Sequence, residues 1–208
     1  MNLNKEELKI INIFRKNLFA ELTLQEIMKI LKKKSYNWTF NTIKKLSETL
    51  LIMQKKGKTN FIKLNLKNKL TIAALEFLDK KEISEKKIPI IDELIASISK
   101  KTVFFILLVF GSYAIGKNQK GSDIDIAIIT ENSRTKKEIK PYIKEVTRLS
   151  TIPADVYTFT QKEFKKMLLN DEENLGKQIF RKHCLAYGNE AYYNIIDEAI
   201  KNGLSFKI

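Results

Sequence analysis

Two carboxylates lie close to a glycine-serine pair in the middle of the sequence. An unbroken apolar run, residues 103–110, ends in Gly111-Ser112, and ten residues later a second apolar run carries Asp123 and Asp125. Carboxylates are costly to place beside an apolar core. Because residues i and i+2 of a strand point to the same face, we expect the two aspartates to project together.

This pair of aspartates has the chemistry of a divalent-cation site. Two carboxylates about 7 Å apart along a strand repel each other unless a cation lies between them. Mg²⁺ prefers oxygen ligands and usually takes one or two carboxylates together with substrate phosphates. Asp155 opens a later apolar stretch, ADVYTFT, and a neighbouring strand could bring it beside the pair. Three carboxylates would complete a two-metal site, in which Asp155 could accept the proton of an attacking hydroxyl.

The glycine-serine pair and the residues after it could bind phosphates. Gly111 allows the backbone to approach a phosphate closely. Ser112 offers a hydroxyl and is expected to start a short helix whose N–H groups favour an anion. Lysines on the same connection could reach a triphosphate. The candidate nucleotide-binding residues are Gly111, Ser112, Lys117, Lys120 and Ser122.

This arrangement resembles the DNA polymerase β-like nucleotidyltransferase superfamily. Its signature is a Gly-Ser after a strand, about ten residues, an Asp-x-Asp on the next strand, and a third Asp on a later strand. The stretch GSYAIGKNQKGSDIDIAI is most similar to the small, minimal nucleotidyltransferases, including antitoxins that partner HEPN-type RNase toxins. The resemblance covers residues 90–193.

The resemblance implies a small mixed sheet with flanking helices and a Mg²⁺-dependent transfer. A nucleoside monophosphate, AMP from ATP as the expected case, would pass from a triphosphate to a hydroxyl. By resemblance, Asp123 and Asp125 hold two Mg²⁺ ions together with Asp155, which also activates the acceptor. Gly111 and Ser112 hold the triphosphate.

The sequence departs from the family pattern at one position, and the resemblance leaves an alternative function open. Family members often have Arg or Lys where this chain has Ile115, and Lys117 lies close enough to compensate. A C-terminal aromatic, Tyr187 or Tyr192, could line the nucleotide pocket. The alternative is a domain that keeps the fold and senses nucleotide or mediates assembly without catalysis.

The first third of the chain has a different pattern. Apolar residues recur at helical spacing over residues 5–17 and 23–32, and Thr39 or Asn41 could cap a third helix. Two apolar segments then flank the polar stretch QKKGKTN, which predicts a β-hairpin. Three short helices followed by a basic hairpin resemble a winged helix-turn-helix domain.

In that family the third helix enters the major groove of DNA and the hairpin contacts the backbone or minor groove. Short polar and basic side chains suit contacts with phosphates and base edges. The candidate DNA-binding residues are Asn37, Thr39, Asn41, Thr42, Lys44, Lys45, Lys55, Lys56 and Lys58. A protein-docking or purely structural module remains the alternative.

The charge of the chain favours a polyanionic partner. The formal net charge is +14; residues 1–79 carry 16 Lys and Arg against 7 Asp and Glu, and residues 80–208 carry 22 against 17. The first third is therefore the most basic part, and nucleic acid or nucleotide phosphates are the expected partners. A lysine-rich surface without a specific partner is the alternative explanation of the total.

These patterns predict an α/β (α+β) protein of two domains. We expect a winged helix-turn-helix domain over 1–79, a linker over 80–89 and a nucleotidyltransferase domain over 90–208. The charged run before Pro89 marks the boundary, and a solvated helix face joining two packed units is the alternative for it. Expected elements of the second domain are strands at 103–110, 124–129 and 154–160, and helices at 90–99, 134–149, 161–169, 172–182 and 190–202.

Composition excludes several other classes. With one cysteine and one histidine, a disulfide framework and a Cys- or His-based zinc site are excluded. The adjacent His183 and Cys184 are expected to pack rather than act as base and nucleophile. No apolar run approaches the ~20 residues of a membrane span, and the N-terminus lacks a signal peptide, so a cytoplasmic protein is expected.

Three functions follow as hypotheses. The first is a nucleotidyltransferase with a protein acceptor, such as a HEPN-type toxin, and a DNA-binding domain for targeting or autoregulation. The second is a DNA-binding transcription regulator, and the third is a transferase that grips a nucleic acid substrate. Paired half-sites on DNA would favour a homodimer.

Overall fold

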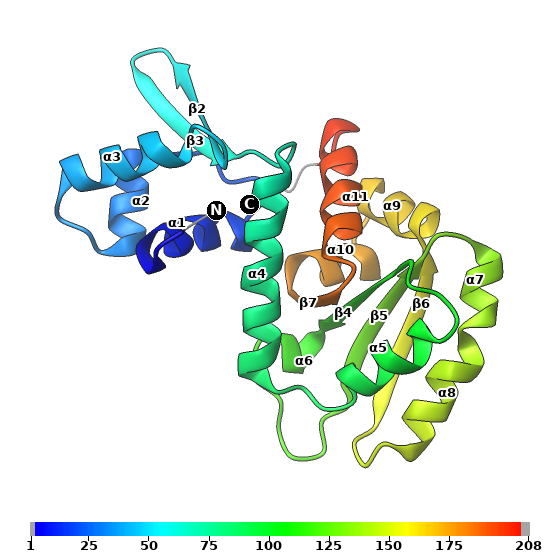
Figure 1. Ribbon diagram of the computed structural model, residues 1–208. Coiled ribbons are helices and arrows are strands. Elements are labelled where there is room, and N and C mark those ends of the chain that lie inside the picture. Colours follow the sequence, from blue (N-terminus) through cyan, green and yellow to red (C-terminus); the bar gives the residue numbers. More distant parts are fainter. Residues whose placement is uncertain (1–2, 205–208) are drawn as a thin grey trace. The chain divides into compact units, whose positions relative to one another are not determined.

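The computed structural model of the protein describes residues 3–204 and divides the chain into two compact units, Met1–Leu78 and Asp79–Ile208. Figure 1 labels the helices and strands of both units. Among the described residues, none of the helices is both long enough and apolar enough to cross a membrane.

The described part of the first unit contains three complete helices, the first part of a fourth, and a three-stranded antiparallel sheet. Its complete helices are α1 (Lys5–Lys16), α2 (Leu24–Leu31) and α3 (Tyr36–Leu46). Strands β2 (Leu51–Lys56) and β3 (Thr59–Leu64) form the predicted hairpin, and the short β1 (Leu22–Thr23) pairs with β3. The apolar residues at helical spacing fill its core, among them Ile10, Phe14, Ile27, Ile43 and Leu46.

The third helix begins earlier than the sequence analysis expected. Ser35 is its N-cap, because the Ser35 hydroxyl accepts a hydrogen bond from the Trp38 N–H at 3.3 Å. Thr39 is buried inside the helix, and its hydroxyl donates to the Ser35 carbonyl at 2.9 Å. The expected cap at Thr39 or Asn41 was therefore wrong, since a serine four residues before Thr39 already satisfies the free N–H groups.

Helix α4 (Lys69–Lys86) contains most of the segment expected as a linker. The charged run lacks Gly and Pro and consists largely of good helix formers. Ion pairs one turn apart support it, Lys81 with Glu85 at 3.8 Å and Lys86 with Glu82 at 3.5 Å. A dense charge run here marks the solvated face of a helix.

The second unit is built on a four-stranded mixed sheet in the order β6-β5-β4-β7. Strands β4 (Phe105–Phe110) and β5 (Ile124–Thr130) are antiparallel, and β6 (Ala154–Thr160) runs parallel to β5. The fourth strand, β7 (His183–Tyr187), pairs antiparallel with β4 and was missed by the sequence analysis. It spans five residues without a clear polar-apolar alternation, so its pattern did not stand out.

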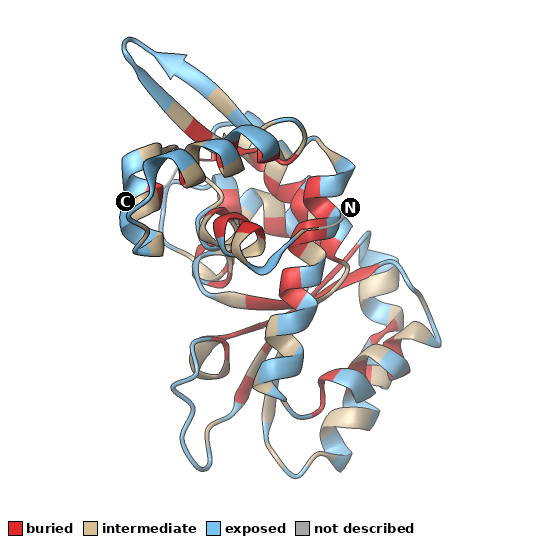
Figure 2. Ribbon diagram, turned by 60° about the vertical axis from the view of Figure 1, so that its left-hand side comes forward, coloured by how far each residue is buried: buried red, intermediate tan, exposed pale blue. Residues whose placement is uncertain are grey.

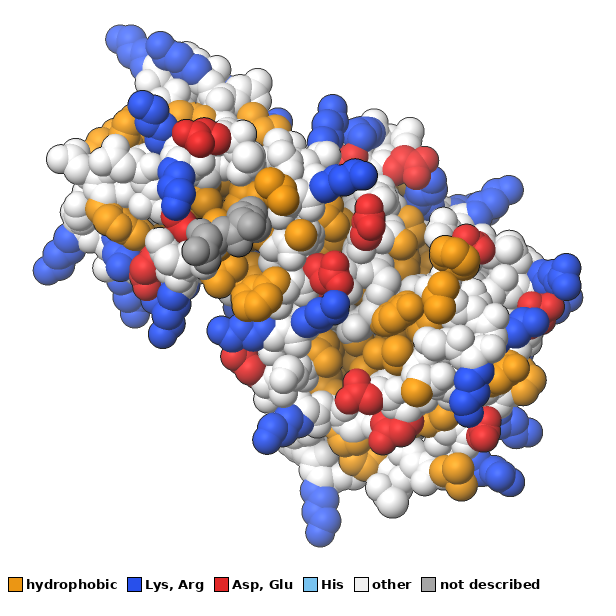
Figure 3. Space-filling model, viewed as in Figure 1, with side chains coloured by type: hydrophobic (Ala, Val, Ile, Leu, Met, Phe, Trp, Pro, Cys, Tyr) orange, Lys and Arg blue, Asp and Glu red, His pale blue; other side chains and the backbone are white. Residues whose placement is uncertain are grey.

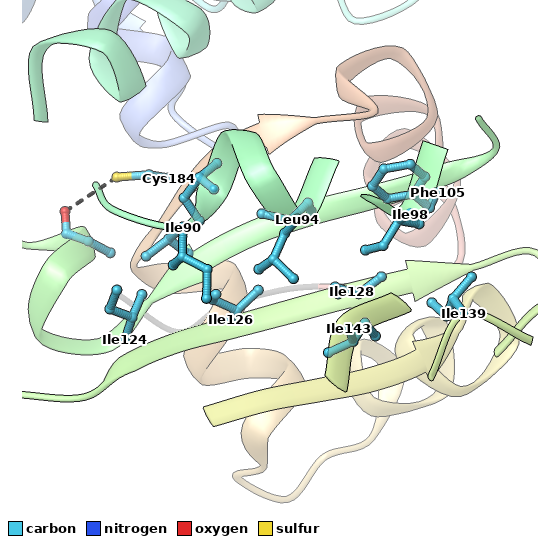
Figure 4. Packing of buried hydrophobic residues seen from close by; sticks show 14 residues of the cluster. Ile90, Leu94, Ile98, Phe105, Ile124, Ile126, Ile128, Ile139, Ile143 and Cys184 are labelled. Carbon is cyan, nitrogen blue, oxygen red and sulfur yellow. Dashed lines mark hydrogen bonds between the residues drawn. The ribbon is translucent and has the colours of Figure 1, made fainter. Parts of the chain in front are cut away.

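Helices cover both faces of this sheet. On one face, α5 (Ile91–Ser99) and α8 (Lys140–Leu149) pack on alternate residues of β4 and β5, and Figure 4 shows Leu94 and Ile98 above the strand that carries Ile126 and Ile128. The other face meets α9 (Gln161–Leu169) and α11 (Asn189–Lys201), with α10 (Leu175–Arg181) against α9. Buried residues accordingly line the strands and the inner sides of the helices in Figure 2.

The single helix expected over 134–149 is two helices, α7 (Ser133–Glu138) and α8. Pro141 lies in the first turn of α8. Proline lacks an N–H group, and its ring disfavours helical geometry at the residue before it, so a continuous helix through this point is unfavourable.

The turn after α4 holds two non-glycine residues in the left-handed region, Lys87 with φ 48° and Ile90 with φ 69°. A β-branched residue rarely adopts this conformation, and Ile90 does so while its side chain is buried in the core. The burial of Ile90 offsets the local strain, whereas the Lys87 side chain is exposed and offers no such compensation.

We predict that Lys87→Gly raises the free energy of unfolding by about 0.5–1 kcal/mol, because glycine adopts the left-handed conformation without the Cβ clash. Thermal unfolding followed by circular dichroism measures the effect. Ser84→Gly, in the interior of α4, is the matched control and should lower the melting temperature. A Lys87→Gly protein that melts below the wild type would show that the lysine side chain stabilises the turn.

Candidate active site

The carboxylates predicted from the sequence lie side by side on the mixed sheet. Asp125 on β5 is paired directly with Asp155 on β6 and, on its other side, with Phe110 on β4. Residues directly opposite each other on neighbouring strands project to the same face. Asp125 and Asp155 therefore share the face opposite to the one covered by α5 and α8, and Asp123 immediately precedes β5.

Asp125 packs against the turn that contains Gly111. A Cβ atom at Gly111 would lie 2.0 Å from Oδ2 of Asp125, which is far inside van der Waals contact. The glycine also has φ 64°, a conformation that L side chains rarely adopt. Both observations require glycine at position 111, and the absent side chain is what gives the Asp125 carboxylate its place beside the turn.

The site is electrostatically unfavourable without a cation. Burial raises the pKa of Asp125 above its usual value, and the charges of Asp155 and then Asp123 raise it further. Asp125 is half-buried, whereas Asp123 and Asp155 are exposed. A carboxylate whose pKa is raised by burial and by neighbouring acids is a feature of functional sites.

The arrangement fits a divalent cation only in part. Within residues 3–204, no group of three or more His, Cys, Asp or Glu side chains is placed to hold a metal ion by itself. The expected cage of three converged aspartates is thus not preformed. Mg²⁺ needs one or two carboxylates when phosphates supply further oxygens, and the exposed Asp123 can change rotamer freely beside Asp125. The donor set therefore suits a cation that arrives with a phosphate ligand.

The connection from β4 to β5 presents two lysines to solvent. It starts with the one-turn helix α6 (Gly111–Ala114), as expected, and Lys117 donates its backbone N–H to the Ser112 carbonyl at 2.9 Å. Lys117 and Lys120 are exposed, and within the described part of the chain neither forms an ion pair. Both amino groups can therefore meet an anionic ligand near Asp123.

Ser122 has a structural task in this connection. Its hydroxyl accepts the Gln119 backbone N–H at 2.8 Å, and its own N–H donates to the Gln119 carbonyl at 3.0 Å. These reciprocal bonds close a small turn just before Asp123. Ser122 thus shapes the loop that carries the lysines, and direct contact with nucleotide is not required to explain it.

The candidates at the C-terminal end lie outside the site. Tyr187 stacks on Phe105 at 4.3 Å and donates its hydroxyl to the Val103 carbonyl at 3.2 Å, and Tyr192 is completely buried. Neither ring is in a position to line a nucleotide pocket. Burial raises the pKa of the Cys184 thiol to about 11, so it stays protonated at neutral pH. His183 Nδ1 lies 3.0 Å from the Ile179 carbonyl, a contact that holds the turn before β7.

One aromatic pair beside the carboxylates was missed by the sequence analysis. Tyr157 follows Asp155 by two residues on β6, and its ring packs at 5.7 Å on that of Phe110. Its side chain remains 39% exposed although it lies on a strand. The period of two along ADVYTFT places Tyr157 on the same face as Asp155 and could have revealed it.

The first unit presents only part of the predicted DNA-binding set. Asn37, Asn41 and Lys44 are exposed along one side of α3. Thr39 is buried and so is not available to DNA, whereas Thr42 is partly exposed and donates its hydroxyl to the Trp38 carbonyl at 2.8 Å. Thr39 lies one turn before the buried Ile43, so it shares the face of α3 that packs into the core.

Two of the predicted lysines already have acidic partners. Lys45 Nζ lies 2.7 Å from Oε1 of the buried Glu7, and Lys56 pairs with Glu21. Lys55 and Lys58 are exposed at the end of the hairpin, where Lys and Arg side chains gather in Figure 3. Of the lysines predicted to bind DNA, Lys44, Lys55 and Lys58 have no acidic partner among residues 3–204.

Comparisons with known proteins concern the second unit. Residues 91–178 match the family model described as a nucleotidyltransferase domain, and this range includes the Gly111 turn and all three aspartates. A comparison with curated proteins finds no match. A solved structure titled "Crystal structure of the toxin-antitoxin with AMP-PNP" is similar at 15% sequence identity with a TM-score of 0.37, over 54% of this chain and 85% of that chain.

We predict that Asp125→Asn raises the melting temperature at pH 7. Because the folded-state pKa of Asp125 is raised, the charged form destabilises the fold at neutral pH and stability is gained as the pH falls. The amide has the same shape and no charge. The difference from the wild type should close as the pH approaches about 4, the ordinary pKa of an aspartate.

Asp171→Asn, at an exposed position, is the control and should leave the melting temperature unchanged at every pH. An Asp125→Asn protein that melts below the wild type at pH 7 would contradict the charge repulsion, since it would mean that the ionised carboxylate stabilises the site.

Proposed function

Since residues 91–178 match a nucleotidyltransferase domain, we propose that the protein transfers a nucleoside monophosphate, AMP from ATP as the expected case, to a hydroxyl acceptor. The observation that carries this proposal is the cross-strand pair of Asp125 and Asp155, with Asp125 held against the side-chain-free backbone of Gly111.

In the proposed reaction the acceptor oxygen attacks the α-phosphorus of the triphosphate. A new O–P bond forms, the bond from the α-phosphorus to the oxygen that bridges to the β-phosphate breaks, and pyrophosphate leaves with that electron pair. Asp155 accepts the hydroxyl proton; it is exposed on the edge strand, where an acceptor can approach. Mg²⁺ held by Asp123 and Asp125 would neutralise charge on the phosphates.

The remaining residues bind and orient the triphosphate. Gly111 allows the phosphates to approach the backbone closely, and the Ser112 hydroxyl can donate to a phosphate oxygen. Lys117 and Lys120 add positive charge on a loop that the Ser122 hydrogen bonds hold in shape. By resemblance, similar proteins often have a basic residue at the position of Ile115, which is 44% exposed here. Lys117 and Lys120 would supply that positive charge instead.

A protein hydroxyl is the acceptor class that we favour. The open edge of β6 leaves Asp155 accessible to a partner surface, and the minimal nucleotidyltransferases that the second unit resembles lack the extra domains that grip long nucleic acids. A toxin of the HEPN type is one such partner by resemblance.

We further propose that the first unit is a winged helix-turn-helix domain that binds double-stranded DNA, for targeting or autoregulation. The supporting observation is the exposed set Asn37, Asn41 and Lys44 on α3 together with Lys55 and Lys58 on the hairpin. If the transferase site does not turn over, the same surfaces describe the alternative, a transcription regulator that senses nucleotide.

The transfer is tested by incubating the protein and MgCl₂ with ATP labelled at the α-phosphate, in the presence of cellular protein or RNA. Label should become attached to the acceptor, and label on the γ-phosphate should not, because pyrophosphate leaves. Asp155→Asn should slow transfer by about 100-fold or more, as expected for loss of a general base, while Asp171→Asn should transfer normally.

Binding of ATP without any transfer of α-label would favour the nucleotide-sensing alternative. Attachment of γ-label would contradict nucleotidyl transfer itself, since it would indicate a kinase-like reaction.

DNA binding is tested by gel shift with the DNA upstream of the coding sequence over a range of salt concentrations. Lys44→Ala and Lys55→Ala should each weaken binding and reduce the slope of log affinity against log salt by about 1, as expected for one lost phosphate contact. Lys16→Ala, at the exposed end of α1, is the control. Equal effects of all three variants would indicate non-specific attraction to a basic protein.

A further inference from the structure

Tyr157 and Phe110 form an aromatic platform at the side of the carboxylates. Tyr157 is paired directly with Ala127, which is completely buried. A small residue at this position leaves room for the Tyr157 ring to lie across β5 and to contact Phe110 on β4, at a ring separation of 5.7 Å. Phe110 in turn is paired with Asp125, so the platform borders the acids.

The Tyr157 side chain is not needed by the core. It is 39% exposed, and its hydroxyl forms no hydrogen bond within residues 3–204. Tyrosine hydroxyls usually find a partner when the ring is used for packing. An exposed ring next to charged carboxylates is instead available to a planar ligand.

The direction of the proposed reaction indicates which ligand group reaches this ring. The attacking and leaving oxygens of phosphoryl transfer are roughly in line. In this site the line runs across the sheet, from Gly111 after β4, where the pyrophosphate end is held, to Asp155 on β6, where the acceptor enters. The nucleoside must therefore leave the α-phosphorus sideways, along the strands.

Only one of the two sideways directions offers an aromatic surface. Toward the strand ends lies the connection 111–123, whose one aromatic residue, Tyr113, is partly buried against the core cluster that includes Ile91 and Leu94 of α5. In the opposite direction, two residue pairs along the strands, lies Tyr157 over Ala127. We propose that the ring of Tyr157, backed by Phe110, stacks on the base of the nucleoside triphosphate, an inference that rests on the proposed function.

Stacking on a ring tolerates any base, because every base has a π-face. The platform therefore selects a nucleotide over a bare polyphosphate and distinguishes weakly between adenine and guanine. The substrate class that follows is a nucleoside triphosphate without strict choice of base.

The test compares two ligands by isothermal titration calorimetry on the full chain in MgCl₂. One is an ATP analogue with a methylene bridge between the α- and β-phosphates, which cannot be cleaved there, and the other is inorganic tripolyphosphate. Tyr157→Ala should weaken the analogue by about 5- to 150-fold, the range for loss of a base-stacking aromatic, and leave tripolyphosphate unchanged. Tyr157→Phe, which keeps the ring, should bind both like the wild type.

Each alternative result has a distinct meaning. Equal weakening of both ligands, or unchanged binding of the analogue, would overturn the base platform. Slower transfer with unchanged affinity for the analogue would also overturn it, and would assign Tyr157 to the acceptor. A wild-type protein that binds neither ligand would refute both the platform and the proposed use of a triphosphate.

Discussion

The close approach of the Asp125 carboxylate to the Gly111 backbone fixes the geometry of the candidate site. A side chain at position 111 would occupy the place of the carboxylate oxygen, so the acid in this position requires glycine at 111. The sheet then adds Asp155 from one neighbouring strand and Phe110 from the other. The groups of the second unit that are proposed to act in the transfer are located relative to this one contact.

The contact that is proposed to serve the reaction also lowers the stability of the folded protein. Packing Asp125 partly out of water beside two other acids raises its pKa and costs stability. Strain of this kind is retained at sites where a ligand offsets it. The exposed lysines on the preceding loop do not neutralise the acids in the absence of a ligand, which keeps the positive charge available for phosphates.

Much of the second unit follows from local sequence patterns. Apolar runs bounded by glycine or polar turns predicted β4, β5 and β6 nearly to the residue, and the i, i+2 spacing of the acids predicted their common face. Strand β7 could not be predicted in this way, because its five residues gain their strand geometry from pairing with β4. Tyr157 was missed for a related reason, since its closeness to Phe110 depends on the small Ala127 of another strand.

In the first unit, the order of helices and hairpin was predictable, and the accessibility of single residues was not. Because α3 starts at Tyr36, Thr39 lies inside the helix, on the buried face that it shares with Ile43. Ion pairs between segments distant in sequence, such as Lys45 with Glu7, occupy side chains that composition alone would count as free. The number of charged residues therefore gives the net charge of the unit, but it does not tell which of these side chains are free to contact a ligand.

The parallel pairing of β5 with β6 has a consequence for protein synthesis. Asp155 follows Asp125 by thirty residues, and the two meet only when β6 has joined the sheet. At a translation rate of about 5–20 residues per second, the third acid leaves the ribosome seconds after the first two. The basic N-terminal unit is completed earlier still. A growing chain can therefore fold the unit proposed to bind DNA before all three aspartates have been synthesised.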